Sequence, residues 1–481
     1  MKIRFYLLLC TLAAILLCGC TDVEEAAVES SVYTYIEPME KLYVTETTAI
    51  TEITETELTI SETTTVSETV SETVSETETT TIPTSAVTTE TTVAETTETA
   101  EITTAETTTI AATETTTVPE TEIAETITES STEILENTLY ESDFKADTDH
   151  VKISGRTYTD NNGTVILSNT CSAVEFAFCG TLAEITLTSD CASSKARVGI
   201  FVNGERAIDK MLTEKATTLT VFESDAPKNC IISIVKLSEQ SHSYVGVKNI
   251  HAVTEYGIIP TPERERKIEF IGDSITCGYG VDAPNEHYDF STETEDGSKT
   301  YAALIGKVLD ADVNIIAWSG IGAYSCYTSG DEPSQWKLVS GIYGNTDTMH
   351  TSKKWDFSSW QPDIVVINIG TNDNSWTRGI SERVDTFGNA YYDLICQVRE
   401  KNPDAYIICS LGAMGKELLP EIEEQVENYS ASTGDNRITT FEFDIQNGYA
   451  DGYGADYHPS AKTHQKMADK LAPFIAELMN W

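Results

Sequence analysis

The rest of this chain is organised around the stretch IEFIGDSITCGYG, from Ile268 to Gly280. Its apolar beginning predicts a buried strand, which breaks at a Gly-Asp-Ser turn before two further glycines. A serine at the exit of a central strand presents its hydroxyl at the carboxyl edge of a sheet, where open α/β folds place their ligand crevices. Ser274 is therefore the candidate nucleophile, although Gly-Asp-Ser triplets also occur in ordinary turns.

Downstream of this stretch, strand patterns alternate with helix patterns. We expect strands at 267–271, 313–318, 363–369, 406–411 and 438–443, and helices around 299–309, 381–401, 418–432 and 460–478. Such alternation predicts a mostly parallel sheet covered by helices on both faces. Residues 259–481 are thus predicted to form a three-layer α/β/α domain.

Residues 143–258 have a different pattern. Short β-branched and aromatic runs, such as VEFAFCG and AEITLTS, are separated by Gly, Asn, Ser and Asp at roughly regular spacing. This pattern predicts an all-β sandwich of jelly-roll type. It contains no catalytic cluster, so its role as a carbohydrate-binding module, a cleft-shaping module or a purely structural partner is left open.

The N-terminus has the order of a secretory signal. Lys2 and Arg4 precede an apolar run that is too short to span a bilayer, and small residues follow, ending at Cys20. The ending resembles a bacterial lipobox. We therefore predict that residues 1–20 are a signal peptide and that Cys20 is lipidated, with simple secretion as the alternative.

Residues 21–142 are predicted to be a disordered linker. They are rich in Thr and Glu, and residues 46–143 hold 23 acidic residues without one Lys or Arg, which is about half of the net charge of −46. The few apolar residues cannot offset the entropy of ordering, and like charges repel. The tract is thus a tether, with bare or O-glycosylated threonines.

The negative net charge also bears on the partners of the chain. Nucleic acid and anionic membranes need clustered Lys or Arg, so neutral ligands fit this chain better.

Three further positions carry candidate partners of the serine. Gly320 follows the second predicted strand of the α/β region and allows a substrate oxygen to approach its backbone N–H. Asn372 follows the third strand and offers a side-chain amide to an oxyanion. His458 stands before the last helix, and a histidine suits the base that a serine needs near neutral pH. Singly, Gly320 fits an ordinary turn and Asn372 an Asx turn, but their joint order makes chance improbable.

At these positions the chain resembles the SGNH (GDSL-type) hydrolases, which share Gly-Asp-Ser, an oxyanion glycine, Gly-x-Asn-Asp and a late histidine. With the β-rich region before them, the architecture resembles carbohydrate esterase family 2, whose members remove acetyl groups from plant polysaccharides. The resemblance covers about residues 145–481. It implies that Ser274 is the nucleophile, that His458 is the base, and that the N–H groups of Ser274 and Gly320 form an oxyanion hole with the Asn372 side chain. No paired metal-ligand spacing or phosphate-cradling loop occurs, so no metal or other cofactor is expected.

One position departs from the superfamily pattern. The acid commonly stands three residues before the histidine, where this chain has Ala455, and the nearest acid is Asp456, two residues before. In an extended segment, residues i and i+2 project to the same side. We therefore expect Asp456 to reach the ring of His458 and complete a triad, with a Ser–His dyad as the alternative.

Aromatic residues near the motifs are candidate sugar contacts, because sugar rings stack on flat aromatic side chains. In the resembled family an aromatic residue directly before the histidine contacts the glycan, and Tyr457 occupies that position. Trp376, Tyr324 and Tyr327 are further candidates, each of which can equally belong to the core.

The sequence thus predicts an extracellular, surface-tethered, monomeric serine esterase that removes acetyl groups from xylan or glucomannan. Another ester hydrolase on the same fold, such as a lipase or arylesterase, is the first alternative, because fold does not define substrate. A non-catalytic carbohydrate-binding surface protein is the alternative of a different class.

Overall fold

The computed structural model describes residues 138–481, except residues 242 and 348–351. The predicted signal peptide, Cys20 and nearly all of the predicted linker lie outside the described residues. Within those residues, every helix is too short or too polar to cross a membrane.

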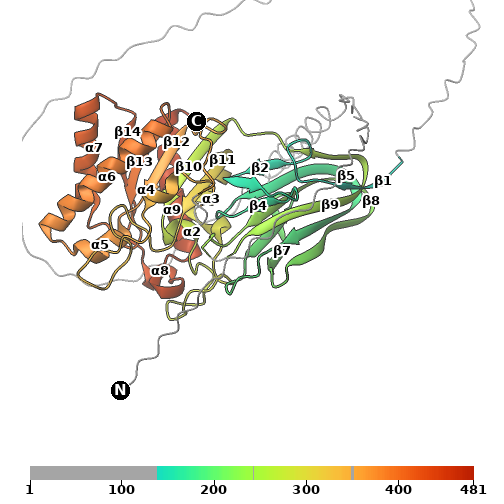
Figure 1. Cartoon of the computed structure of the whole chain (residues 1–481), viewed down its shortest axis with the longest axis horizontal. Coiled ribbons are helices and arrows are strands. Elements are labelled where there is room, and N and C mark those ends of the chain that lie inside the picture. Colours follow the sequence, from blue (N-terminus) through green and yellow to red (C-terminus); the bar gives the residue numbers. More distant parts are fainter. Residues whose placement is uncertain (1–137, 242, 348–351) are drawn as a thin grey trace, which may run out of the picture. The chain divides into compact units, whose positions relative to one another are not determined.

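The described elements form two sheets and their covering helices (Figure 1). The strands of sheet A are β1 (Tyr140–Phe144), β2 (Lys152–Ser154), β3 (Thr157–Thr159), β4 (Val165–Leu167), β5 (Ala173–Thr188), β6 (Arg197–Val202), β7 (Glu205–Met211), β8 (Ala216–Lys236) and β9 (Val245–Pro260). The strands of sheet B are β10 (Arg266–Gly272), β11 (Ala311–Ala317), β12 (Ile364–Asn368), β13 (Tyr406–Leu411) and β14 (Ile438–Glu442). The helices are α2 (Ser274–Cys277), α3 (Tyr301–Val308), α4 (Val339–Tyr343), α5 (Thr371–Thr377), α6 (Ser381–Lys401), α7 (Leu419–Thr433), α8 (Gly448–Asp451) and α9 (Ala461–Met479), with short 3₁₀ turns η1 (Gly297–Lys299) and η2 (Ala455–Tyr457).

Sheet B is parallel throughout and has the order β11-β10-β12-β13-β14. The interior strand β10, which lies between β11 and β12, contains only buried residues from Ile268 to Gly272, because helices cover both faces of the sheet. On one face Ile271 packs in a cluster with α6 and α7, and on the other Phe270 packs with α3 and α9. The predicted parallel sheet between two helical layers is therefore confirmed, with strand and helix bounds within about two residues of those expected.

Sheet A is a single curled antiparallel sheet of nine strands. Its main path is β3-β4-β9-β5-β8-β6-β7, while β1 joins β9 and β2 joins β5. The runs VEFAFCG and AEITLTS, which the sequence indicated as separate strands, are one 16-residue strand, β5. Gly180 does not lie in a turn: it lies at an irregularity in the pairing of β5 with β8 and β9. A glycine is needed there because an added Cβ would meet the Val253 carbonyl oxygen.

Sheet A extends from Tyr140 to Pro260, slightly beyond the predicted limits of 143 and 258, and the division into domains stays a prediction. Its apolar face forms a separate core that draws on β4, β5, β6, β8 and β9. Each sheet thus has its own hydrophobic core.

Buried ion pairs join the two regions. Arg156, between β2 and β3, is fully buried and its Nη2 donates to Glu269 Oε2 of β10 at 2.9 Å. Lys152 of β2 donates to Asp312 of β11 at 2.6 Å. Because an unpaired buried charge is costly, these pairs fix how the regions meet.

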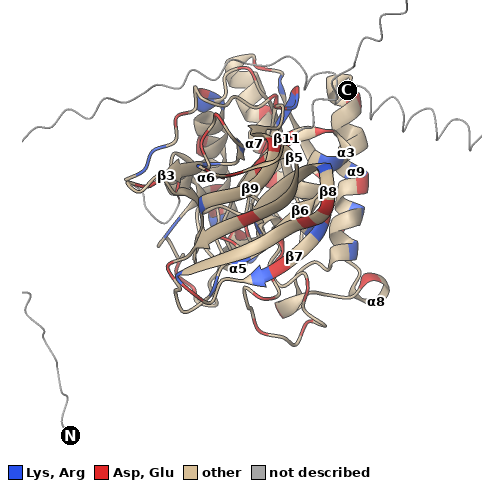
Figure 2. Cartoon of the chain, turned by 90° about the vertical axis from the view of Figure 1, so that its right-hand side faces the viewer, with Lys and Arg blue, Asp and Glu red and all other residues tan. Residues whose placement is uncertain are grey.

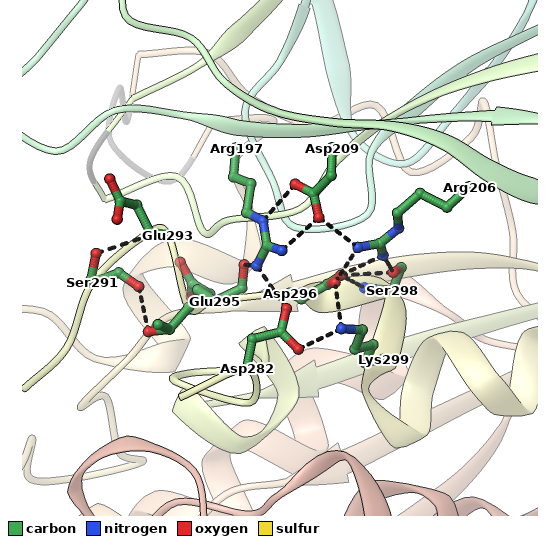
Figure 3. A network of polar contacts seen from close by, with 11 residues as sticks. Arg197, Arg206, Asp209, Asp282, Ser291, Glu293, Glu295, Asp296, Ser298 and Lys299 are labelled. Carbon is green, nitrogen blue, oxygen red and sulfur yellow. Dashed lines mark hydrogen bonds and ion pairs between the residues drawn. The ribbon is translucent and has the colours of Figure 1, made fainter. Parts of the chain in front are cut away.

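A second network joins β6 and β7 to the segment between α2 and α3 (Figure 3). Arg197 donates to Asp282 at 2.8 Å, and Arg206 donates to Asp296 at 2.6 Å. Asp209 accepts from both arginines and lies between them. The segment that contains Asp282 and Asp296 is therefore held by sheet A.

Candidate active site

Ser274 begins the short helix α2, separated by one residue from the end of the interior strand β10. The Asp273 side chain caps this helix by accepting a hydrogen bond from the Ile275 N–H at 3.0 Å. The turn requires glycine at position 272, since a Cβ there would lie 2.0 Å from the Thr276 hydroxyl oxygen. The tight strand-to-helix turn thus places Ser274 at the carboxyl edge of sheet B.

His458 lies against Ser274, as the sequence predicted. Its Nε2 is 2.9 Å from Ser274 Oγ, and its Nδ1 is 3.1 Å from the carbonyl oxygen of Ala455. A carbonyl only accepts, so Nδ1 carries the hydrogen and Nε2 is free to accept the serine proton. The Tyr279 ring stacks on the imidazole with centroids 3.9 Å apart. Burial lowers the pKa of His458 to about 4, so the ring is a neutral base at pH 7.

The geometry expected for Asp456 is wrong. The segment is not extended: it forms η2, with Asp456 at φ 49° and Tyr457 at φ 62°, both left-handed. The Asp456 carboxylate accepts a hydrogen bond from the Tyr279 hydroxyl at 2.7 Å. The prediction that Asp456 is a triad acid assumed an extended segment, and the structure does not have one.

The candidate oxyanion residues lie around Ser274. Gly320 follows β11 and has φ +83°, a left-handed backbone conformation that favours glycine. An added Cβ would meet no atom, so the glycine is needed for this conformation and not for lack of space. Asn372, the second residue of α5, donates from Nδ2 to Asp273 Oδ2 at 3.2 Å and to the Ile321 carbonyl at 2.9 Å. The amide therefore joins the turn before Ser274 to the segment that contains Gly320.

Two further carboxyl groups organise the site, and the sequence analysis assigned them no role. Asp373 accepts hydrogen bonds from the backbone N–H groups of residues 323, 324 and 325 at 2.8–2.9 Å. Burial raises the pKa of Asp373 to about 6 and that of Asp273 to about 7. Asp273 lies in the Gly-Asp-Ser motif and Asp373 in the Gly-x-Asn-Asp motif, so these motifs were the sequence signal that could have identified both residues.

The candidate aromatic contacts separate into exposed and packed residues. Tyr457 is 53% exposed and Tyr327 is 66% exposed. Trp376 is 7% exposed, donates from Nε1 to a backbone carbonyl, and packs against Tyr324 with ring centroids 5.0 Å apart. Tyr457 therefore remains available to a ligand, whereas Trp376 is mainly a packing residue.

Comparison with known proteins gives the class. Residues 268–471 match the model of GDSL-like lipases and acylhydrolases, and residues 153–262 match that of the carbohydrate esterase 2 N-terminal domain. With the Ser–His pair at the edge of a parallel sheet, these matches define a serine carboxylic ester hydrolase. The chain belongs to the family 2 carbohydrate esterases.

Individual relatives are consistent with this assignment. The cellulase/esterase CelE of Acetivibrio thermocellus is 34% identical over 326 residues, which cover 64% of this chain and 37% of that protein. An acetylxylan esterase / glucomannan deacetylase of Cellvibrio japonicus is 24% identical over 69% of this chain and 90% of its own length. A family two carbohydrate esterase from Clostridium thermocellum, solved with cellohexaose, is 32% identical with a TM-score of 0.62 over 69% of this chain and 99% of that one. The chain thus spans little more than a third of the first of these relatives.

Proposed function

We propose that this protein removes O-acetyl groups from a plant cell-wall polysaccharide, xylan or glucomannan, through an acyl-enzyme on Ser274. The observation that carries the proposal is the 2.9 Å contact of Ser274 Oγ with His458 Nε2 beside the Gly320 turn. The names of the relatives support an acetylated polysaccharide as substrate. Acidic and basic side chains are interspersed along β7 and α9 (Figure 2), so neither element presents a surface of a single charge sign.

In the proposed mechanism, His458 Nε2 takes the Ser274 proton while Oγ attacks the acetyl carbonyl carbon. The N–H groups of Ser274 and Gly320, and Asn372 Nδ2 once it leaves Asp273, donate to the developing oxyanion. The imidazolium then gives its proton to the departing sugar oxygen, which leaves as a hydroxyl. A water molecule attacks the acyl carbon while His458 Nε2 accepts its proton. The bond from the acyl carbon to Ser274 Oγ then breaks, Oγ takes back the proton, and acetate is released. The Ala455 carbonyl holds Nδ1–H throughout, so the proposed pair needs no carboxylate on the ring.

The test compares acetate release from acetylated xylan, acetylated glucomannan and 4-nitrophenyl acetate. We expect hydrolysis of the aryl ester and of at least one polymer, and loss of both activities in Ser274→Ala. Hydrolysis of the aryl acetate with no release from either polymer would contradict the polysaccharide substrate and favour a lipase or arylesterase.

The proposal includes a monomer tethered to the cell surface by a lipid on Cys20, which rests on the sequence alone. In Cys20→Ala the protein should move from the membrane fraction to the medium, because the acylated residue is lost. Cys10→Ala, within the apolar run, is the matched control and should stay in the membrane fraction. A wild-type protein found wholly in the medium would refute the lipid anchor.

A further inference from the structure

Glu239 belongs to the region of sheet A but contacts the loops of the active site. It follows the last residues of β8 and is 2% exposed. Its Oε2 accepts a hydrogen bond from the backbone N–H of Ser319 at 2.8 Å. The same oxygen is 3.5 Å from Cys277 Sγ, whose thiol donates because burial raises its pKa well above the ordinary value.

Both contacts lie next to oxyanion donors. Ser319 directly precedes Gly320, and Cys277 ends the helix that Ser274 begins. In the described part of the chain, the N–H groups of Ser274 and Gly320 have no hydrogen-bond acceptor, while that of Ser319 is bound to Glu239. One carboxylate oxygen therefore contacts both of the segments that carry these two N–H groups.

Glu239 is itself held on both sides of its backbone. Its N–H donates to Glu295 Oε2 at 2.9 Å, and its carbonyl oxygen accepts from Lys236 Nζ at 2.8 Å. Lys236 and Glu295 are fully buried. The Glu295 segment is anchored in turn by Arg197, which donates to the Glu295 carbonyl at 3.2 Å (Figure 3).

The cluster around Glu239 also contains a buried cation and a second buried carboxyl group. Burial raises the pKa of Glu295 well above its ordinary value, and the neighbouring Glu239 raises it further. Burial lowers the pKa of Lys236 to about 8, and the nearby acidic groups Glu295 and Glu239 limit this fall, so Lys236 is mainly an ammonium ion at pH 7. The three groups Glu239, Cys277 and Glu295 lie close enough to hold a cation, but the ammonium already supplies the positive charge.

We infer that Glu239 is a positioning residue of the esterase site: its carboxylate fixes the Ser319 N–H and so directs the N–H of Gly320 at the acyl oxygen. This inference rests on the proposed function. It gives the region of sheet A a part in catalysis, because the oxyanion hole is complete only when the loop after β8 reaches into the region of sheet B. Small errors in the placement of such a donor have large effects on rate.

The test compares Glu239→Gln with Glu239→Met in the full chain. Both remove the charge and keep the side-chain length, but only Gln retains an oxygen that can accept from the Ser319 N–H. With 4-nitrophenyl acetate, kcat of the Met variant should be about tenfold to a hundredfold below that of the Gln variant, with KM changed by less than about threefold. Glu184→Gln, whose carboxylate accepts from Thr220 on sheet A, is the matched control and should behave as wild type.

A second measurement separates positioning from stability. A boronic acid that forms a tetrahedral adduct on Ser274 should bind the Met variant more weakly than the Gln variant by the same factor as the loss in kcat, because both report the oxyanion hole. Equal kcat in the two variants would overturn the inference. Unfolding of either variant would also overturn it, since Glu239 would then serve the fold. A wild type inactive on every acetate would instead refute the proposed function.

Discussion

The two sheets use their strand ends differently. In sheet B all strands run the same way, so the residues that follow β10, β11 and β12 meet at one edge, and these include Ser274, Gly320 and Asn372. In sheet A neighbouring strands run in opposite directions, so their ends are divided between two edges. The region of sheet A therefore contacts the region of sheet B at several separate places: through Arg156 and Lys152, through the arginines of β6 and β7, and through Glu239. The parallel sheet thus brings the candidate site residues to one edge, and the region of the antiparallel sheet provides contacts that hold the segments around them.

The largest effect on this difference between the sheets is expected from removing the proposed nucleophile at the carboxyl edge of sheet B. Ser274→Ala should lower kcat by about 10⁴ or more, with the free energy of unfolding nearly unchanged. Because serine and histidine act as one unit, adding His458→Ala should cause little further loss. Activity measurements with calorimetry on both variants check this, and losses that add would contradict a shared step.

The support from sheet A is tested by Arg156→Met. This change leaves Glu269 buried without its cation, so we expect the free energy of unfolding to fall by about 3–5 kcal/mol in urea titrations. Arg264→Met is the matched control: its ion pairs with Asp310 and Asp312 involve a half-exposed guanidinium, and about 1 kcal/mol or less is expected. Similar losses in the two variants would show that the buried pair does not join the regions.

The pH dependence of kcat/KM tests the burial of the base. His458 must be neutral to accept the proton, and its pKa is lowered to about 4, so activity should be level from pH 5 to 8 and fall about tenfold per unit below pH 4. Tyr279→Ala exposes one face of the ring and should move this limb to higher pH. A wild-type limb near the ordinary value of 6.5 would contradict the buried geometry.

The smallest expected effect concerns Asp456, for which the sequence and the structure lead to different predictions. A triad acid made neutral costs up to about 10⁴ in kcat. Because the Asp456 carboxylate bonds to Tyr279 and the Ala455 carbonyl holds Nδ1, we expect Asp456→Asn to cost less than tenfold, about 1.4 kcal/mol. Tyr279→Phe removes the same hydrogen bond from the other side and should match it. A loss near 10⁴ would restore the triad.

The sequence was sufficient wherever a local pattern decides the structure. Hydrophobic periodicity placed the strands and helices of sheet B, since side chains of a strand between two helical layers must be apolar on both faces. Because the ends of parallel strands share one edge, the sequence also predicted that Ser274, Gly320 and Asn372 lie close together, with His458 near them. The sequence-based prediction failed at Gly180, because a β-bulge and a turn have the same local sequence signature.

The sequence alone was enough to predict the α/β fold and to select Ser274 and His458 as the proposed nucleophile and base, because these depend on residue type and on the order of strands along the chain. Only the tertiary structure decided which groups surround them. Asp456 bonds to Tyr279 because Asp456 and Tyr457 have left-handed backbone conformations. The Ala455 carbonyl oxygen accepts the hydrogen of the His458 ring. Glu239, in the loop after β8, contacts Ser319, which lies 80 residues further along the chain. Such contacts depend on backbone direction and on packing between distant segments, and no spacing along the chain encodes either.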